Sequence, residues 1–232
     1  MISDLRQPEA VFFDWDGTLV DSFGLLHAAH NHTRAELGFD SFSIEEFEGY
    51  FGQPREILYA KLYPDKMDEA KKHFEAYVLN NHIDGLKPMS GAGVLLELLY
   101  KMQIPCGVVS NKKRTLIEAE IASYGWEKCF VSVVGAGEAS VDKPSSEPLK
   151  LAVSRSGLNV GMENIWFVGD TDNDVLCSDA AGSVTVLIAS KNQAKPLLEK
   201  YKIHLHCNNC SELYEFLLQY EGKPLKKVIK TI

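Results

Sequence analysis

The sequence predicts a doubly wound α/β fold, in which helices cover both faces of a parallel sheet and an all-helical domain is inserted after the first strand. From residue 88 onward, short segments rich in valine and isoleucine alternate with segments whose apolar residues recur at three- and four-residue spacing. Residues 22–84, in contrast, carry only helical patterns. Near-continuous apolar strands separated by helices are typical of a parallel sheet that is buried on both faces.

The first expected strand is the stretch "AVFFDWDG", residues 10–17, which begins the sheet and ends in polar residues. The chain then leaves the sheet for the helical insert and returns near "GLKPMSG". We therefore expect residues 1–20 and 88–232 to form the α/β core domain, and residues 21–87 to form the helical domain.

The insert contains helical patterns at 23–38, 43–51, 55–63 and 67–82. Ser43, followed three residues later by Glu46, predicts a capping box at the start of the second of these helices. No segment of the insert predicts a strand.

The later part of the core is expected to add further strands and helices in alternation. The expected strands are 104–110, 129–135, 164–170 and 183–189, and the helical patterns are 92–102, 114–125, 145–157 and 173–182. Alternation in "KIHLHC" predicts a last strand, and Ser211 is the expected cap of a final helix.

Composition narrows the class of protein. The 232 residues are 45% hydrophobic and 24% charged, with a net charge of −8, so no basic field favours nucleic acid or a membrane surface. The first residues lack the pattern of a secretory signal, and no apolar run approaches the roughly 20 residues that span a bilayer. Five cysteines suggest reduced thiols. We expect a cytoplasmic protein, either a monomer or a homodimer.

A group of histidines and cysteines near the expected last strand could suggest a metal site. These residues are His204, His206, Cys207 and Cys210, which lie close together in the sequence. A structural zinc site usually shows a second, separated pair of ligands, and the sequence offers none. The last-strand interpretation is therefore favoured over a metal site.

Polar residues follow several of the expected strands, and in a parallel sheet the carboxyl ends of the strands meet at one edge, where ligands bind. A hydroxyl, an amide, a lysine and several carboxylates are thereby expected to converge there. They are Asp14, Asp16, Thr18, Ser110, Asn111, Lys143, Asp170 and Asp174.

This set of groups suits phosphoryl transfer. A carboxylate that attacks a phosphate dianion meets like-charge repulsion, which a divalent cation and a lysine relieve. Carboxylate oxygens are the ligands that Mg²⁺ prefers. Of Asp14 and Asp16, one could act as nucleophile and metal ligand while the other transfers protons.

Four segments, "DWDGTLVDS", "VVSNK", "DKPSSEP" and "GDTDNDVLCSDAAG", resemble in order and spacing the signature motifs of the haloacid dehalogenase superfamily. The likeness extends over nearly the whole chain. It implies a Rossmannoid core, and the helical insert is similar to the C1 cap of that superfamily. "VVSNKK" and the length of the cap look most like the phosphoglycolate-phosphatase-like branch.

By this resemblance, Asp14 would be the nucleophile that forms an aspartyl-phosphate, and Asp16 the general acid and base. Ser110 would bind the phosphoryl group with Asn111 nearby, and Lys143 would neutralise charge on the nucleophile and the phosphate.

The resemblance also implies a Mg²⁺ site. Asp14, the backbone carbonyl of Asp16 and Asp170 would hold the ion, with Asp174 as an outer partner. Thr18 is a further candidate for phosphate binding. In the cap, "FGQPREIL" resembles the segment that selects the substrate, where Arg55 could meet a second anionic group.

The predicted function is therefore hydrolysis of a small phosphomonoester, phosphoglycolate-like or a sugar phosphate, by a Mg²⁺-dependent phosphatase. The dehalogenases and phosphonatases of the superfamily lack an aspartate at the position of Asp16. By this resemblance, Asp16 favours phosphoester hydrolysis or phosphomutase chemistry. A sugar phosphomutase similar to β-phosphoglucomutase needs the same residues and stays open, as does an inactive binding protein of the same fold. A phospho-accepting receiver domain fits less well, because such domains are about half as long and lack a helical insert. The expected partner is a small phosphorylated metabolite.

Overall fold

The computed structural model describes residues 5–50 and 55–222. Internal contacts divide the chain into two compact units, with the divisions between Val20 and Asp21 and between Lys87 and Pro88. The first unit contains the ends of the chain and the main sheet, and the second contains the inserted helices.

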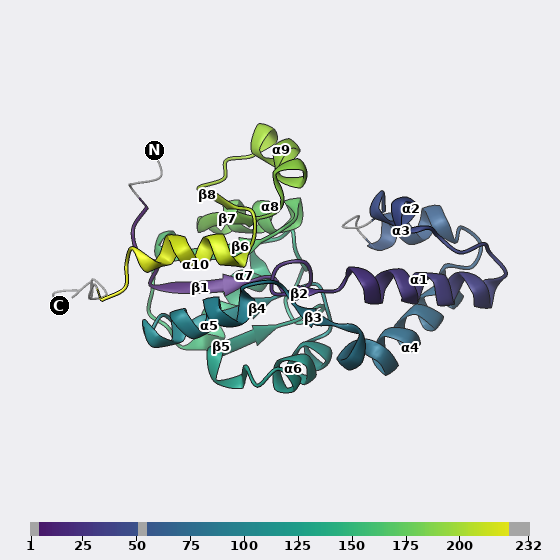
Figure 1. The fold of residues 1–232 in the computed structure, drawn as a ribbon, viewed down its shortest axis with the longest axis horizontal. Coiled ribbons are helices and arrows are strands. Elements are labelled where there is room, and N and C mark those ends of the chain that lie inside the picture. Colours follow the sequence, from purple (N-terminus) through teal and green to yellow (C-terminus); the bar gives the residue numbers. More distant parts are fainter. Residues whose placement is uncertain (1–4, 51–54, 223–232) are drawn as a thin grey trace. The chain divides into compact units, whose positions relative to one another are not determined.

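The first unit is built on a six-stranded sheet in which every pair of neighbouring strands is parallel. The strand order is β5-β4-β1-β6-β7-β8, so β1 lies in the middle (Figure 1). The predicted doubly wound sheet is confirmed. The strands are β1 (Ala10–Phe13), β4 (Cys106–Val109), β5 (Phe130–Val134), β6 (Ile165–Gly169), β7 (Val184–Ile188) and β8 (Leu205–Cys207).

Helices cover both faces of this sheet, because its central strands are apolar on both sides. Figure 1 shows α5 and α10 side by side in front of the strands and α7 behind them. On the α7 face, Ala10 and Phe12 of β1 pack with Leu149 and Ala152 of α7 and with Cys177 of α8. The helices are α5 (Ala92–Lys101), α6 (Arg114–Ser123), α7 (Glu147–Ser156), α8 (Asp172–Ala181), α9 (Lys191–Lys200) and α10 (Cys210–Leu218), with short 3₁₀ turns at Glu127–Cys129 and Met162–Asn164.

The first strand ends earlier than expected, at Phe13 instead of residue 17. The amide of Asp14 still donates to Val168 of β6, at 2.8 Å, but the chain then turns. The carbonyl of Trp15 accepts from the amides of both Leu19 and Val20 at 3.0 Å. These local bonds replace the sheet ladder, so the polar residues after Phe13 belong to a tight turn at the sheet edge.

The second unit contains α1 (Phe23–Leu37), α2 (Ile44–Glu48), α3 (Arg55–Leu62) and α4 (Met67–Gly85). The predicted capping box is present: Ser43 Oγ accepts from the amide of Glu46, and Glu46 Oε2 accepts from the amide of Ser43 at 2.8 Å. A core that includes Tyr59, Tyr63 and Ala70 holds α1, α3 and α4 together.

Two short strands join the units. β2 (Val20–Asp21) and β3 (Lys87–Pro88) pair as a two-stranded sheet, so the two connections of the chain run beside each other. The sequence does not predict these strands, because two residues are too few to show alternation. None of the described helices is long and apolar enough to cross a bilayer.

Candidate active site

The site lies where β1, β4 and β6 end, and these three strands are neighbours in the sheet. Asp14 follows β1, Ser110 follows β4, and Asp170 follows β6. Since the chain winds outward from β1 in both directions, this edge is the place where the strand order reverses, which is where open α/β sheets bind ligands.

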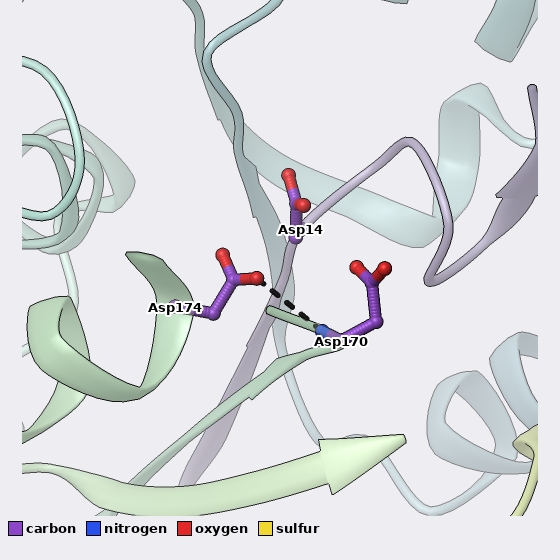
Figure 2. A group of neighbouring side chains, drawn as sticks. All are labelled: Asp14, Asp170 and Asp174. Atoms are coloured by element: carbon purple, nitrogen blue, oxygen red, sulfur yellow. Dashed lines mark hydrogen bonds between the residues drawn. The ribbon is translucent and has the colours of Figure 1, made fainter. Parts of the chain in front are cut away.

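Three carboxylates gather at this edge. Oxygen atoms from Asp14, Asp170 and Asp174 all lie within 4.8 Å of one another. Figure 2 shows that they come from three elements: the turn after β1, the end of β6 and the first turn of α8. Among the side chains that the structure describes, residues 5–50 and 58–222, this is the only such group of three or more potential metal ligands.

Asp174 is fixed by the start of α8. Its Oδ2 accepts from the amide and the hydroxyl of Thr171, at 3.0 and 2.8 Å, and from the amide of Asp170, at 3.3 Å. Thr171 and Asp174 thereby form a capping box. The same carboxylate that caps the helix thus holds the backbone of Asp170 in place, leaving Oδ1 to face the site.

Lys143 links two of these carboxylates. Its Nζ lies 2.7 Å from Oδ1 of Asp14 and 2.7 Å from Oδ1 of Asp174, and the residue is only 6% exposed. Burial lowers the pKa of Lys143, but the charges of Asp14 and Asp174 outweigh burial and hold it above its usual value. The lysine is therefore a permanent positive charge beside Asp14.

The side chain of Asn111 positions the backbone at Lys143. Its amide nitrogen donates to the carbonyl of Lys143 at 3.0 Å, and its Oδ1 accepts from the amide of Lys143 at 3.1 Å. These two bonds join the loop after β4 to the segment before α7. Ser110 is buried beside them, and its Oγ accepts from the amide of Lys112 at 3.3 Å.

Burial and crowding disfavour the ionised carboxylates. Burial raises the pKa of Asp14 to about 6, against the lowering effect of Lys143. Burial, followed by the charges of Asp174 and Asp14, raises the pKa of Asp170 well above its usual value. The protein groups alone therefore do not fully stabilise the ionised forms of Asp14 and Asp170.

A divalent cation fits this arrangement. When all three carboxylates are ionised, they and the single ammonium of Lys143 give a formal charge of −2, because three negative charges oppose one positive charge. Asp14 Oδ1 is buried and has an ion pair, but no directed hydrogen bond. Hard oxygen donors around an unbalanced double charge suit Mg²⁺.

The hydroxyl of Thr18, which is predicted to bind phosphate, bonds in this structure to a carboxylate. The residue is fully buried, and its Oγ1 donates to Oδ1 of Asp170 at 2.9 Å. In this structure the hydroxyl orients a carboxylate of the candidate metal site and is not open to a ligand.

Gly17 allows the turn after β1 to approach Asp170. Its φ is +83°, and a Cβ at this position would lie 2.3 Å from Oδ2 of Asp170. We expect Gly17→Ala to destabilise the fold by about 1–2 kcal/mol through the left-handed backbone and also to displace Asp170, so that the activity predicted for the site falls at least about 10-fold through misplacement of its groups.

Gly38 provides a matched control. Its φ is +78°, but a Cβ there would meet nothing within 4 Å. Gly38→Ala should therefore show a similar loss of stability in thermal unfolding with little loss of activity. Equal activity losses in the two variants would contradict the role assigned to the close approach.

Asp16 lies at the same edge, and its carboxylate contacts Lys112, a residue of the loop after β4. Its Oδ1 accepts from Lys112 Nζ at 3.1 Å, and Lys112 also pairs with Glu120 of α6 at 2.7 Å. Lys112 follows the strand expected at 104–110 and was thus expected at this edge, but the sequence predicted no role for it or for Glu120. The signal was present, because Glu120 falls between Ile117 and Ile121 on the buried face of a helix, where a charge is unexpected.

Two further expectations concern other parts of the chain. The side chain of Arg55, with most of "FGQPREIL", lies outside the described residues. The cluster near the last strand is structural, since His204 Nδ1 accepts from the amide of Thr185 and His206 bonds the carbonyl of Ala189. Cys210 begins α10 and donates to the carbonyl of Thr18.

Comparison with known proteins places this geometry in context. Residues 11–188 match the model of the haloacid dehalogenase-like hydrolase family. A phosphoglycolate phosphatase from Neisseria meningitidis is 30% identical over 195 residues, which cover 80% of this chain and 82% of the relative. Pyrophosphatase PpaX from Bacillus velezensis is 28% identical over 208 residues, covering 90% and 95%.

A solved structure has the same fold. It is a haloacid dehalogenase-like hydrolase from Streptococcus pneumoniae, with a TM-score of 0.78 and 24% identity, and the match covers 89% of this chain and 97% of that one. At this level of identity the likeness concerns the fold alone.

Proposed function

Because the chain belongs to the haloacid dehalogenase-like hydrolase family, we propose that it is a Mg²⁺-dependent phosphatase that hydrolyses a small phosphomonoester through an aspartyl-phosphate on Asp14. One observation carries the proposal: the Asp14 carboxylate lies 2.7 Å from the buried ammonium of Lys143 and is grouped with Asp170 and Asp174. A carboxylate in this setting can approach an anionic phosphoryl group, since the ammonium of Lys143 and a bound divalent cation would together offset the repulsion.

In the first half-reaction, an oxygen of Asp14 forms a bond to phosphorus while the bond from phosphorus to the leaving oxygen breaks. Asp16 gives its proton to that oxygen, and the alcohol departs. Lys143 balances charge on Asp14 and on the phosphoryl oxygens, and Ser110, which follows β4, is expected to bind one of those oxygens.

In the second half-reaction, water attacks phosphorus and Asp16 accepts the proton of the water. The bond between phosphorus and Asp14 breaks, which releases inorganic phosphate and restores the carboxylate. When bound, Mg²⁺ supplies electrostatic stabilisation of the charge that develops on the phosphoryl oxygens. Asp14, Asp170 and the backbone carbonyl of Asp16 would hold it, with Asp174 as an outer partner.

Two substrates are supported by the relatives. Phosphoglycolate is the first candidate, because the Neisseria meningitidis relative is named for its hydrolysis. Pyrophosphate is the second candidate, because the Bacillus velezensis relative is named a pyrophosphatase. Both compounds are small and carry a phosphoryl group on an anionic leaving group.

The test is phosphate release from a panel that contains phosphoglycolate, pyrophosphate, sugar phosphates and nucleotides. We expect release with Mg²⁺, loss of release with excess chelator, and recovery when Mg²⁺ is restored. Ca²⁺ should restore less activity, because it is larger and its coordination is less regular.

The panel also separates the alternatives. Release that persists in chelator would contradict the metal dependence. No release from any compound, with conversion of a sugar phosphate to its isomer, would replace the phosphatase by a phosphomutase. No reaction at all in a folded protein would favour an inactive binding protein.

A further inference from the structure

The helix α6 carries a carboxylate into the interior. Glu120 is fully buried and shares the inner face of the helix with Ile117 and Ile121. Desolvation of an ionised carboxylate costs several kcal/mol, which only well-placed partners offset. A buried charge on an otherwise apolar helix face therefore calls for an explanation in terms of the groups that it contacts.

Two of those groups come from the catalytic edge of the sheet. Glu120 accepts from Nε1 of Trp15 at 2.5 Å, and its carboxylate lies 2.7 Å from Nζ of Lys112. Trp15 stands between Asp14 and Asp16 in the chain, so one end of this network belongs to the segment that carries both aspartates.

The other end reaches Asp16 directly. Lys112 Nζ also donates to Oδ1 of Asp16 at 3.1 Å, and the lysine side chain is only 10% exposed. The backbone of Lys112 is fixed as well, because its carbonyl accepts from the amide of Ala136 at 2.9 Å. A Cβ on Gly135 would lie 2.7 Å from that carbonyl, so the two segments are in close contact.

The inner part of the network, at Trp15 and Glu120, is buried, and Trp15 packs against aromatic rings. Trp15 is fully buried and packs edge to face on Trp126 and Phe130, with ring centroids 6.1 and 6.2 Å apart. Electrostatic interactions are stronger in such an environment than in water. The position of Lys112 is therefore strongly constrained by the carboxylate of Glu120.

We propose that Glu120 is a positioning residue for proton transfer: it holds Lys112, and Lys112 fixes Oδ1 of Asp16 so that the other carboxylate oxygen faces the leaving group. The role is one of orientation and rests on the function proposed above for Asp16. Glu120 does not contact the substrate.

The test compares two esters in the variant Glu120→Gln. Glutamine keeps an acceptor for the indole N–H but loses the charge that holds Lys112. Departure of an alkoxide from phosphoglycolate needs a proton from Asp16, whereas departure of 2,4-dinitrophenolate does not. We expect kcat/KM for phosphoglycolate, or for the best alkyl ester of the panel, to fall about 10-fold or more, and kcat/KM for 2,4-dinitrophenyl phosphate to stay near the wild-type value.

The matched control is Glu118→Gln. Glu118 lies on the same helix, but it is exposed and pairs with Arg114 at 2.7 Å, so both esters should react as with the wild type. Equal losses on the two esters in Glu120→Gln would overturn the proposal, because they indicate general damage to the site. No loss on either ester would overturn it too. If Glu120→Gln does not fold, Lys112→Met applies the same comparison by removing the ammonium that joins Glu120 to Asp16.

Crystal structures of the wild type and of Glu120→Gln supply a readout that does not depend on activity. We expect Lys112 to leave Asp16 in the variant; an unchanged contact would overturn the proposal. If the wild type hydrolyses neither ester, the proposed function fails, while the crystal structures still decide whether Glu120 positions Lys112 and Asp16.

Discussion

Replacement of Asp14 by asparagine is expected to abolish turnover, with a loss of roughly 10⁴-fold or more, as is seen when nucleophiles are removed from other hydrolases. The amide has nearly the same shape as the carboxylate, but it cannot form the bond to phosphorus. Phosphate release under saturating substrate and Mg²⁺ measures the effect. Turnover near the wild-type rate would contradict the assignment of Asp14 as nucleophile.

The loss should not arise from unfolding. Burial raises the pKa of Asp14 to about 6, so above that pH ionisation of Asp14 opposes folding in the absence of metal. The neutral amide removes this opposing effect. In chelator at neutral pH, Asp14→Asn should therefore unfold at a temperature at least as high as the wild type. Asp179→Asn, on the exposed side of α8, is the matched control and should keep full activity.

Asp16→Asn is expected to lower turnover of alkyl esters by about 10²–10⁴-fold, the usual contribution of general acid and base catalysis. Its effect should differ between the two half-reactions. With 2,4-dinitrophenyl phosphate the first half-reaction needs no proton, but breakdown of the aspartyl-phosphate still needs the base. The phosphorylated enzyme should therefore accumulate.

The accumulation is measured by acid quenching after reaction with an ester that is labelled at phosphorus. Hydroxylamine should release the label from the protein, as expected for an acyl phosphate. The double variant Asp14→Asn/Asp16→Asn should retain no label. Normal steady turnover of an alkyl ester by Asp16→Asn, without accumulation, would contradict the proton-transfer role of Asp16.

The convergence of the site could be predicted because it follows from the sheet. Parallel strands end at one edge, so residues that follow β1, β4 and β6 meet whatever the details of the loops. Asp14, Ser110 and Asp170 are placed in this way. Lys143 was expected near the same edge, and the structure brings its ammonium to two carboxylates.

The partners of individual side chains could not be predicted in the same way. A helical pattern indicates that Glu120 faces inward, but it does not indicate that Lys112 and Trp15 meet it there. The predicted cap of the last helix was wrong for a similar reason. Asn209, not Ser211, caps α10, because its side chain accepts from the amide of Glu212 at 3.0 Å.

The two bonds between Asn111 and Lys143 involve only the backbone of Lys143. These two bonds therefore do not require a particular side chain at residue 143. During divergence, a descendant of this protein that lost the lysine, and with it the chemistry, could retain the same loop. At residue 143 the backbone makes the bonds to Asn111, and the side chain makes the contacts with the carboxylates of the site. A substitution here can therefore remove the chemistry and leave the bonds to Asn111 in place.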